Sequence, residues 1–279
     1  MLETLISTMR LLKFTNNGGF SLTQFRDDKL PNYVILSHTW GQDDSEVTFK
    51  DMIEGTGQEK EGYKKLLFCG NQAKADGFLY FWVDTCCINK SDINEFTKSI
   101  NSMFRWYQNA ARCYVYLSDV TVQSIHTTIQ PDTEWESAFI KSRWFTRGWT
   151  LQELIAPKFV DFYSRNLVLL GDKIKLEQHI TKITGISKEA LHGHLDDFTI
   201  DERFLWAEKR ETTEPEDKAY CLLGIFNISL PLIYGEGQQN AMKRLRREIE
   251  QSKDPNPSLK GNIPKSIEYF IKLINISWN

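Results

Sequence analysis

Three short apolar runs, without alternating polar positions, mark the predicted strands of this chain. They cover residues 33–36, 78–83 and 112–117, and polar residues, proline or glycine stand at their ends. Strands that are apolar on both faces are typical of a buried parallel sheet. Two earlier runs within 10–25 flank an Asn-Gly dipeptide, which accepts the positive φ angles of a tight turn. They predict an N-terminal β-hairpin.

Helical periodicity lies between these runs. The stretch 59–77 is expected to be helical, and a second helix follows the capping pair Asp92 and Glu95, with apolar side chains at helical spacing up to Tyr107. Alternating strands and helices predict an α/β fold, a parallel sheet flanked by helices. Ligands of such sheets bind outside the carboxyl ends of the strands. The polar groups expected at this edge are Ser37-His38, Asp84 and Ser118-Asp119.

The second half of the chain changes character. A helix is expected over 146–156, a hairpin over 159–170, and mostly helices as far as residue 250. After Ser252 three prolines indicate a linker. The predicted parts are an N-terminal hairpin segment at 1–30, a sheet core at 31–172, a helical extension at 173–250, and a linker and tail at 251–279.

Composition excludes several functions. The chain has 279 residues, of which 25% are charged and 41% hydrophobic, and its net charge of −3 gives no basic field for nucleic acid. No run approaches the roughly 18 apolar residues of a membrane span, and the N-terminus lacks a signal-peptide pattern. Five cysteines without C-x-x-C spacing favour neither disulfides nor zinc, so a cytoplasmic location is expected. The aromatic share of 13% is high.

Two polar constellations follow predicted strands. The run Ser37-His38-Thr39-Trp40 can hydrogen-bond a sugar or phosphate and stack on a ring. It is also typical of a capped strand end whose tryptophan packs into the core. From this motif alone, the capped strand end is the favoured interpretation. Asp84 precedes Cys86 and Cys87, which with His38 would suit a cysteine hydrolase. Cysteines outside a nucleophile motif are more often small buried hydrophobes, so the hydrolase is disfavoured.

A third constellation lies in the expected helix over 146–156. Trp149, Gln152 and Glu153 are spaced i, i+3 and i+4, which places the carboxylate over an indole. A carboxylate against an aromatic wall is partly desolvated, as functional acids often are. A salt bridge from Glu153 to Arg143 or Arg147 explains the position as well, and the residues alone do not separate these alternatives.

Together the motifs resemble the HET (heterokaryon incompatibility) domain of fungal self/non-self recognition proteins, from about Tyr33 to about Glu250. The matching segments are YVILSHTWG at 33–41, FWVDTCCINK at 81–90, SRWFTRGWTLQELIAP at 142–157, PEDKAYCLLGIF and LIYGEG. HET domains are similar to TIR domains, whose sheet is flavodoxin-like. A TIR domain has a Trp-Cys-x-x-Glu helix, to which Trp149 through Glu153 is similar, with Thr150 in place of the cysteine.

The resemblance implies an effector of programmed cell death and makes Glu153 the catalytic residue of NAD⁺ cleavage, with NAD⁺ as substrate and no tightly bound cofactor or metal. Strand-end position suggests further contacts to NAD⁺ from Ser37, His38, Trp40, Asp84 and Trp149. It also implies self-association and receptor modules of the NLR type, or incompatibility partner proteins. The alternative is a non-enzymatic module that triggers cell death by assembly.

Overall fold

The computed structural model describes residues 8–42, 44–123 and 134–252 of the chain. Within them the strands form one seven-stranded sheet in the order β2-β1-β4-β3-β5-β6-β7. Their bounds are β1 Thr8–Phe14, β2 Phe20–Arg26, β3 Tyr33–His38, β4 Tyr80–Trp82, β5 Arg112–Leu117, β6 Val160–Ser164 and β7 Leu169–Asp172. The three apolar runs are thus strands β3, β4 and β5, as predicted.

The four central strands β4-β3-β5-β6 are parallel. Numbered in chain order they run 2-1-3-4, which is the flavodoxin-like order. Ile35 pairs with Trp82 on one side and with Cys113 on the other, so β3 lies at the centre of the sheet with every residue buried. The α/β fold with a flavodoxin-like parallel sheet is therefore confirmed.

Antiparallel strands extend the sheet at both ends. The predicted N-terminal hairpin is β1 and β2, whose turn over 15–19 contains Gly18 at φ 82°, a conformation that glycine adopts without strain. Strand β1 pairs with β4 through Leu12 and Phe81. At the other end β6 and β7 form the second predicted hairpin.

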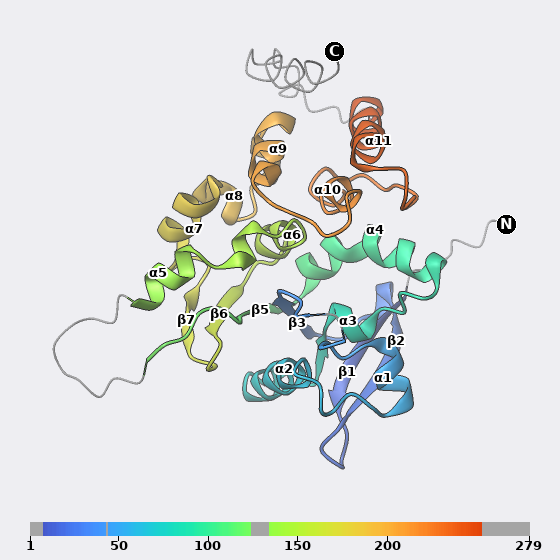
Figure 1. Cartoon of the computed structure of the whole chain (residues 1–279), viewed down its shortest axis with the longest axis vertical. Helices are drawn as coiled ribbons and strands as arrows, with labels where there is room; N and C mark the ends of the chain where they lie inside the picture. The colour runs from blue at the N-terminus through green and yellow to red at the C-terminus, as the bar shows by residue number, and fades with distance from the viewer. Residues whose placement is uncertain (1–7, 43, 124–133, 253–279) are drawn as a thin grey trace.

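Helices cover both faces of the sheet (Figure 1). The α-helices are α1 Phe49–Glu54, α2 Tyr63–Ala75, α3 Asp84–Cys87, α4 Ile93–Asn109, α5 Glu134–Ile140, α6 Thr150–Ile155, α7 Glu177–Thr184, α8 Lys188–Leu191, α9 Ile200–Glu208, α10 Asp217–Tyr220 and α11 Gln238–Gln251; the 3-10 helices are η1 Asp27–Lys29, η2 Arg143–Thr146 and η3 Leu195–Asp197. Helix α2 lies on one face, whereas α4 and α6 lie on the other, where the helices after β7 continue the same layer. The helical C-terminal extension is as predicted.

Two helix predictions need correction. The expected helix over 146–156 is shorter, because η2 and a turn at Gly148 precede α6. Asp92 caps α4 as predicted, but the carboxylate of Glu95 binds Arg10 and the backbone nitrogen of Asn89 and so does not complete a capping box. Helix α1, which has a full capping box, was not predicted.

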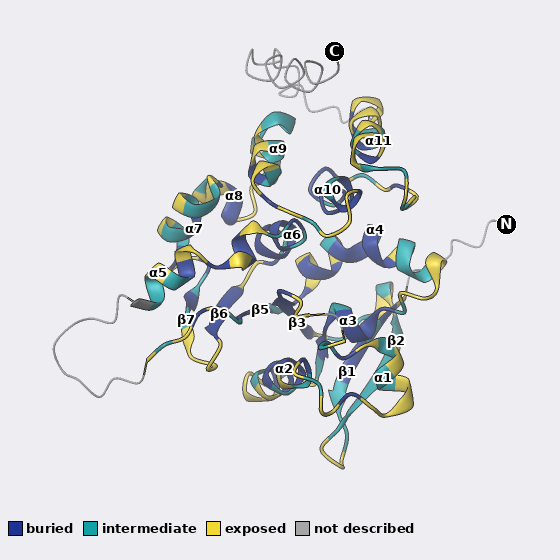
Figure 2. Ribbon diagram, viewed as in Figure 1, coloured by how far each residue is buried: buried dark blue, intermediate teal, exposed yellow. Residues whose placement is uncertain are grey.

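The core is rich in aromatic rings. Trp82, Trp106 and Trp144 are fully buried, and Figure 2 shows the central strands and the overlying α6 mostly in the colour of buried residues. Within the described residues no helix combines the length and apolarity that a membrane crossing requires. The predicted linker and tail lie outside the described residues from position 253 onward.

Candidate active site

Glu153 lies on α6, a six-residue helix in which every side chain is buried. The helix has no side-chain cap of its own at Trp149, and Pro157 follows its end. Instead the hydroxyl of Thr150 donates to the carbonyl of Arg147 at 2.9 Å and ties the helix to the preceding turn. The fold therefore brings Glu153, only 8% exposed, against the carboxyl ends of the central strands.

The Glu153 carboxylate belongs to a buried network with Ser37, Trp144 and Tyr107. The hydroxyl of Ser37, at the end of β3, donates to Glu153 Oε2. Trp144 Nε1 donates to Ser37 Oγ at 2.8 Å, and the Tyr107 hydroxyl lies beside the carboxylate while donating to the carbonyl of Leu36 at 3.2 Å. Each partner is an uncharged donor, so the Glu153 network holds the carboxyl group in place without neutralising a negative charge.

Burial dominates the electrostatics of this carboxyl group. Desolvation raises the pKa of Glu153 to about 8, and the charge of Asp84 acts in the same direction. The hydrogen bond from Ser37, the adjacent hydroxyl of Tyr107 and the positive charge of Arg210 oppose this rise. The group is therefore mainly neutral at pH 7, and an approaching cation would favour its ionisation.

The alternative salt bridge to Glu153 is not formed. Arg143 donates to the carbonyl of Trp40 at 3.0 Å, and Arg147 donates to Thr213 Oγ1 at 3.2 Å. Among the described residues neither arginine forms an ion pair with Glu153. Its burial is therefore not explained by these two arginines.

His38, Trp40 and Asp84 form a second group at the same edge of the sheet. Trp40 Nε1 donates to Asp84 Oδ2 at 2.9 Å, and His38 Nδ1 lies 4.0 Å from Asp84 Oδ1. On its other side His38 Nε2 lies 3.6 Å from Glu46, which also binds Lys65. Since His38 directly follows Ser37, the structure brings four of the predicted contact residues to the edge where Glu153 lies.

Trp149 makes a hydrogen bond that the sequence did not predict. It precedes α6, and its Nε1 donates to Asp217 of α10 at 2.8 Å. The indole that joins the Glu153 network is Trp144, held by η2. Trp149 has helical backbone angles at the start of α6, so its spacing to Glu153 is kept, while its indole nitrogen is bound to Asp217.

Sequence reasoning missed the residues that pack against this site from distant segments. Tyr107 was assigned to a buried helix face, which is confirmed, but the contact of its hydroxyl with the Glu153 carboxylate was not predicted. Glu46 and Lys65 lay in stretches without a motif, and Arg210 lay in the helical extension. A buried arginine is detectable only once the fold is known, so no sequence signal identified it.

The structure disfavours cysteine chemistry. All five cysteines are free and buried. Burial raises the pKa of the Cys86 thiol well above its usual value, which opposes thiolate formation, and the backbone nitrogen of Val83 donates to Cys87 Sγ at 3.4 Å. In the described part of the chain no group of three or more His, Cys, Asp or Glu residues is arranged to hold a metal ion.

Comparison with known proteins identifies the domain. A family model described as heterokaryon incompatibility protein (HET) matches residues 33–132. The chain is 51% identical over 243 residues to the vegetative incompatibility protein HET-E-1 of Podospora anserina, an alignment that covers 86% of this chain and 18% of that protein. The chain thus spans less than a fifth of that relative's length. No solved structure matches significantly. This chain is a member of the HET-domain family.

Proposed function

We propose that this chain acts in heterokaryon incompatibility, the process that the description of its family states, and that its HET domain cleaves the N-glycosidic bond of NAD⁺. The observation that supports cleavage is the position of Glu153. A desolvated carboxyl group lies beside polar side chains at the carboxyl edge of a flavodoxin-like sheet, where such folds bind nucleotides. Its substrate would be free NAD⁺, with no resident cofactor.

The chemistry requires one carboxylate. The breaking bond joins C1′ of the ribose to the pyridinium nitrogen, and its electron pair leaves with nicotinamide, which becomes neutral. Because the leaving group is already cationic, it needs no general acid. The Glu153 carboxylate would stabilise the positive charge that develops on the ribose. Water then adds to C1′ and loses a proton, which gives ADP-ribose.

Substrate binding would set the ionisation of Glu153. In the free protein burial keeps the pKa near 8, so the carboxyl group is mostly protonated at pH 7. A pyridinium cation within a few ångströms favours the charged form and lowers that pKa. The proton would therefore leave Glu153 as NAD⁺ binds, and Ser37 would continue to orient the carboxylate.

The secondary contacts follow from the second group at the sheet edge. His38 Nε2 faces the Glu46 carboxylate, whereas Nδ1 has no hydrogen-bond partner among the described residues, so a ribose hydroxyl or phosphate oxygen can satisfy Nδ1. Asp84 already accepts from Trp40 and retains acceptor capacity for a hydroxyl. Trp149 is committed to Asp217 and would act by positioning the start of α6.

The test compares wild-type protein with Glu153→Gln, which keeps the shape of the side chain. Glu208→Gln, an exposed position on α9, is the matched control. Purified proteins are incubated with NAD⁺, and nicotinamide release is measured; NAD⁺ is also measured in cells that express each variant. We expect Glu153→Gln to lose at least about a hundredfold in rate. Undiminished cleavage by this variant would remove Glu153 from the mechanism.

Cell death by assembly alone is the competing function. In the enzymatic proposal, self-association and partner modules would activate NAD⁺ cleavage. If Glu153→Gln kills cells as the wild type does while cellular NAD⁺ stays constant, assembly is sufficient and the enzymatic proposal fails.

A further inference from the structure

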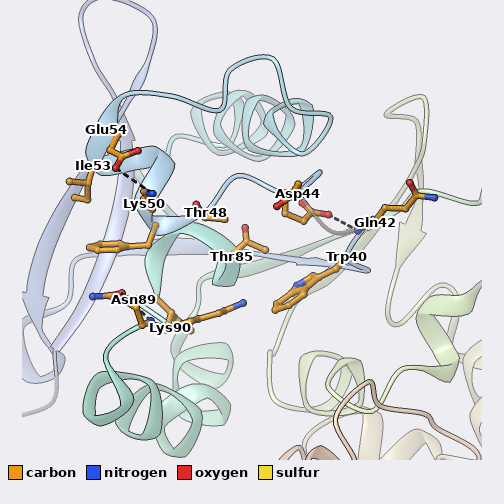
Figure 3. A pocket seen from close by; sticks show the side chains of 15 residues that line it. Trp40, Gln42, Asp44, Thr48, Lys50, Ile53, Glu54, Thr85, Asn89 and Lys90 are labelled. Atoms are coloured by element: carbon orange, nitrogen blue, oxygen red, sulfur yellow. Dashed lines mark hydrogen bonds and ion pairs between the residues drawn. The ribbon is translucent and has the colours of Figure 1, made fainter.

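A cavity of about 710 Å³ opens beside the second group, between α1 and the loop that follows α3. Figure 3 shows Trp40 at one end and Lys50 of α1 with Asn89 at the other, and the Lys90 side chain extends from that end toward Trp40. Thr85 lies on the central wall. The volume is within the usual range for small-molecule sites, about 300–1,000 Å³.

Trp40 presents a fixed aromatic face to this cavity. The side chain is 45% exposed, which is unusual for a tryptophan that follows a buried central strand. Its Nε1 donates to Asp84, and its carbonyl accepts from Arg143, so both the ring and the backbone are held. The ammonium of Lys90 lies 3.5 Å from the ring centroid, in a cation–π contact.

Among the described residues, the charged side chains that line the cavity are paired except for Lys90 and the exposed Asp44. Glu46 binds Lys65 beneath the cavity, and Glu54 lies 3.8 Å from Lys50 on the same helix. Lys90 forms no ion pair within the described residues; burial lowers the pKa of its ammonium group, and the charge of Asp84 opposes that shift. A phosphate group is the kind of anion that such a lysine binds.

A second, independent feature points to a ligand. Thr85 is buried, with 5% of the residue exposed, and apart from the weak neighbouring thiol of Cys86 its hydroxyl has no hydrogen-bond partner among the described residues. Buried polar groups are nearly always paired, so an unpaired one in a cavity wall indicates a missing partner. A base or ribose with hydrogen-bonding atoms can supply it.

We propose that this cavity binds the adenine nucleotide half of NAD⁺, with the base stacked on Trp40 and a phosphate bound by Lys90. This inference rests on the proposed function. The ammonium leaves the ring face when it turns to the phosphate, and the base takes its place. The opposite orientation is disfavoured, because the charge of Lys90 would repel the nicotinamide pyridinium.

The probe is adenosine monophosphate, titrated into the whole chain by isothermal calorimetry at low salt. Wild type is expected to bind one molecule. Lys90→Met removes the charge but keeps most of the stem, and Trp40→Leu removes the ring; each should weaken binding about tenfold or more. Lys74→Met, an exposed lysine on α2, is the matched control and should bind as wild type does. Circular dichroism checks that each variant is folded.

Several outcomes would overturn the inference. These are no binding of adenosine monophosphate to folded wild type, unchanged binding by Lys90→Met, or inorganic phosphate binding as tightly as the nucleotide. Nicotinamide mononucleotide is titrated in parallel, and its preference over adenosine monophosphate would reverse the orientation and contradict the proposal. Failure here with NAD⁺ cleavage intact leaves the proposed function standing. Binding without any NAD⁺ cleavage supports the cavity and refutes the enzyme.

Discussion

At the scale of the single residue, the burial of Glu153 opposes the ionisation that the proposed chemistry needs. Burial raises the pKa of Glu153 to about 8, whereas the proposed chemistry needs the ionised form. Because kcat/KM reports the free enzyme, we expect it to rise about tenfold per pH unit below pH 8 and then level off. The rising part of the pH profile of kcat should lie at lower pH than that of kcat/KM, since bound pyridinium favours the carboxylate. Nicotinamide release across pH 5.5–9.5 measures both, and a flat kcat/KM profile would contradict this role.

The same carboxyl group should give stability a pH dependence. Its folded pKa, about 8, lies above the ordinary value of 4.5. Between these values the folded state holds a proton that the unfolded state has lost, so the free energy of unfolding falls by up to about 1.4 kcal/mol per pH unit as pH rises. Glu153→Gln removes this slope. In urea unfolding, the free energy of unfolding of Glu153→Gln should increase relative to that of wild type between pH 5 and 8. Glu208→Gln should show no such relative increase.

At the scale of the element, α6 depends on two buried cations. A helix of six residues is not stable alone. Arg210 donates to the carbonyl of Arg147 at 2.8 Å and to Thr150 Oγ1 at 2.9 Å, at the start of the helix. At its end, Lys173 donates to the carbonyls of Leu154 at 3.3 Å and Pro157 at 2.6 Å. Packing and these bonds, rather than helix propensity, hold the Glu153 side chain in place.

Arg210→Met tests this dependence. We expect a loss of about 3 kcal/mol in the free energy of unfolding, because buried acceptors lose a charged donor. The charge of Arg210 also opposes the raised pKa of Glu153, so its removal should move the rising limb of kcat/KM to higher pH. Arg247→Met, with an exposed side chain on α11, is the control and should change neither. An unshifted limb in a folded, active Arg210→Met protein would contradict the coupling.

The extent of prediction from sequence differs between elements for a physical reason. Strands β3, β4 and β5 were predictable because central parallel strands need unbroken apolar runs. Helix α6 was mispredicted in length, since its start depends on bonds to Arg210, which lies 60 residues beyond Thr150. The resemblance gave Glu153, whereas its contact with Tyr107 depends on the packing of two helices that local periodicity does not encode.

At the scale of the whole molecule, the helical extension is hydrogen-bonded to the segment that precedes and contains Glu153. Arg147 and Glu211 form an isolated parallel bridge, and the backbone nitrogen of Gly148 donates to the carbonyl of Glu211 at 2.8 Å. Asp217 joins Trp149 to Tyr234, at 2.8 and 2.9 Å. The sheet edge and the extension therefore build one site, and disturbing their joint should disturb the chemistry.

Two glycines at this joint allow that coupling to be measured. A Cβ at Gly148 would meet Thr212 Cγ2 at 2.5 Å and Cys221 Sγ at 3.1 Å, and a Cβ at Gly224 would collide with Phe104 of α4. Overpacking of this kind costs about 1–3 kcal/mol, so Gly148→Ala and Gly224→Ala should each lower the free energy of unfolding by that amount. Gly19→Ala, whose Cβ would meet its nearest atom at 3.7 Å, is the control.

Because Gly148 directly precedes the Glu153 segment, Gly148→Ala should also slow NAD⁺ cleavage more than Gly224→Ala does, under conditions where both stay folded. Equal cleavage rates in the two variants would mean that the extension supports the fold without positioning Glu153.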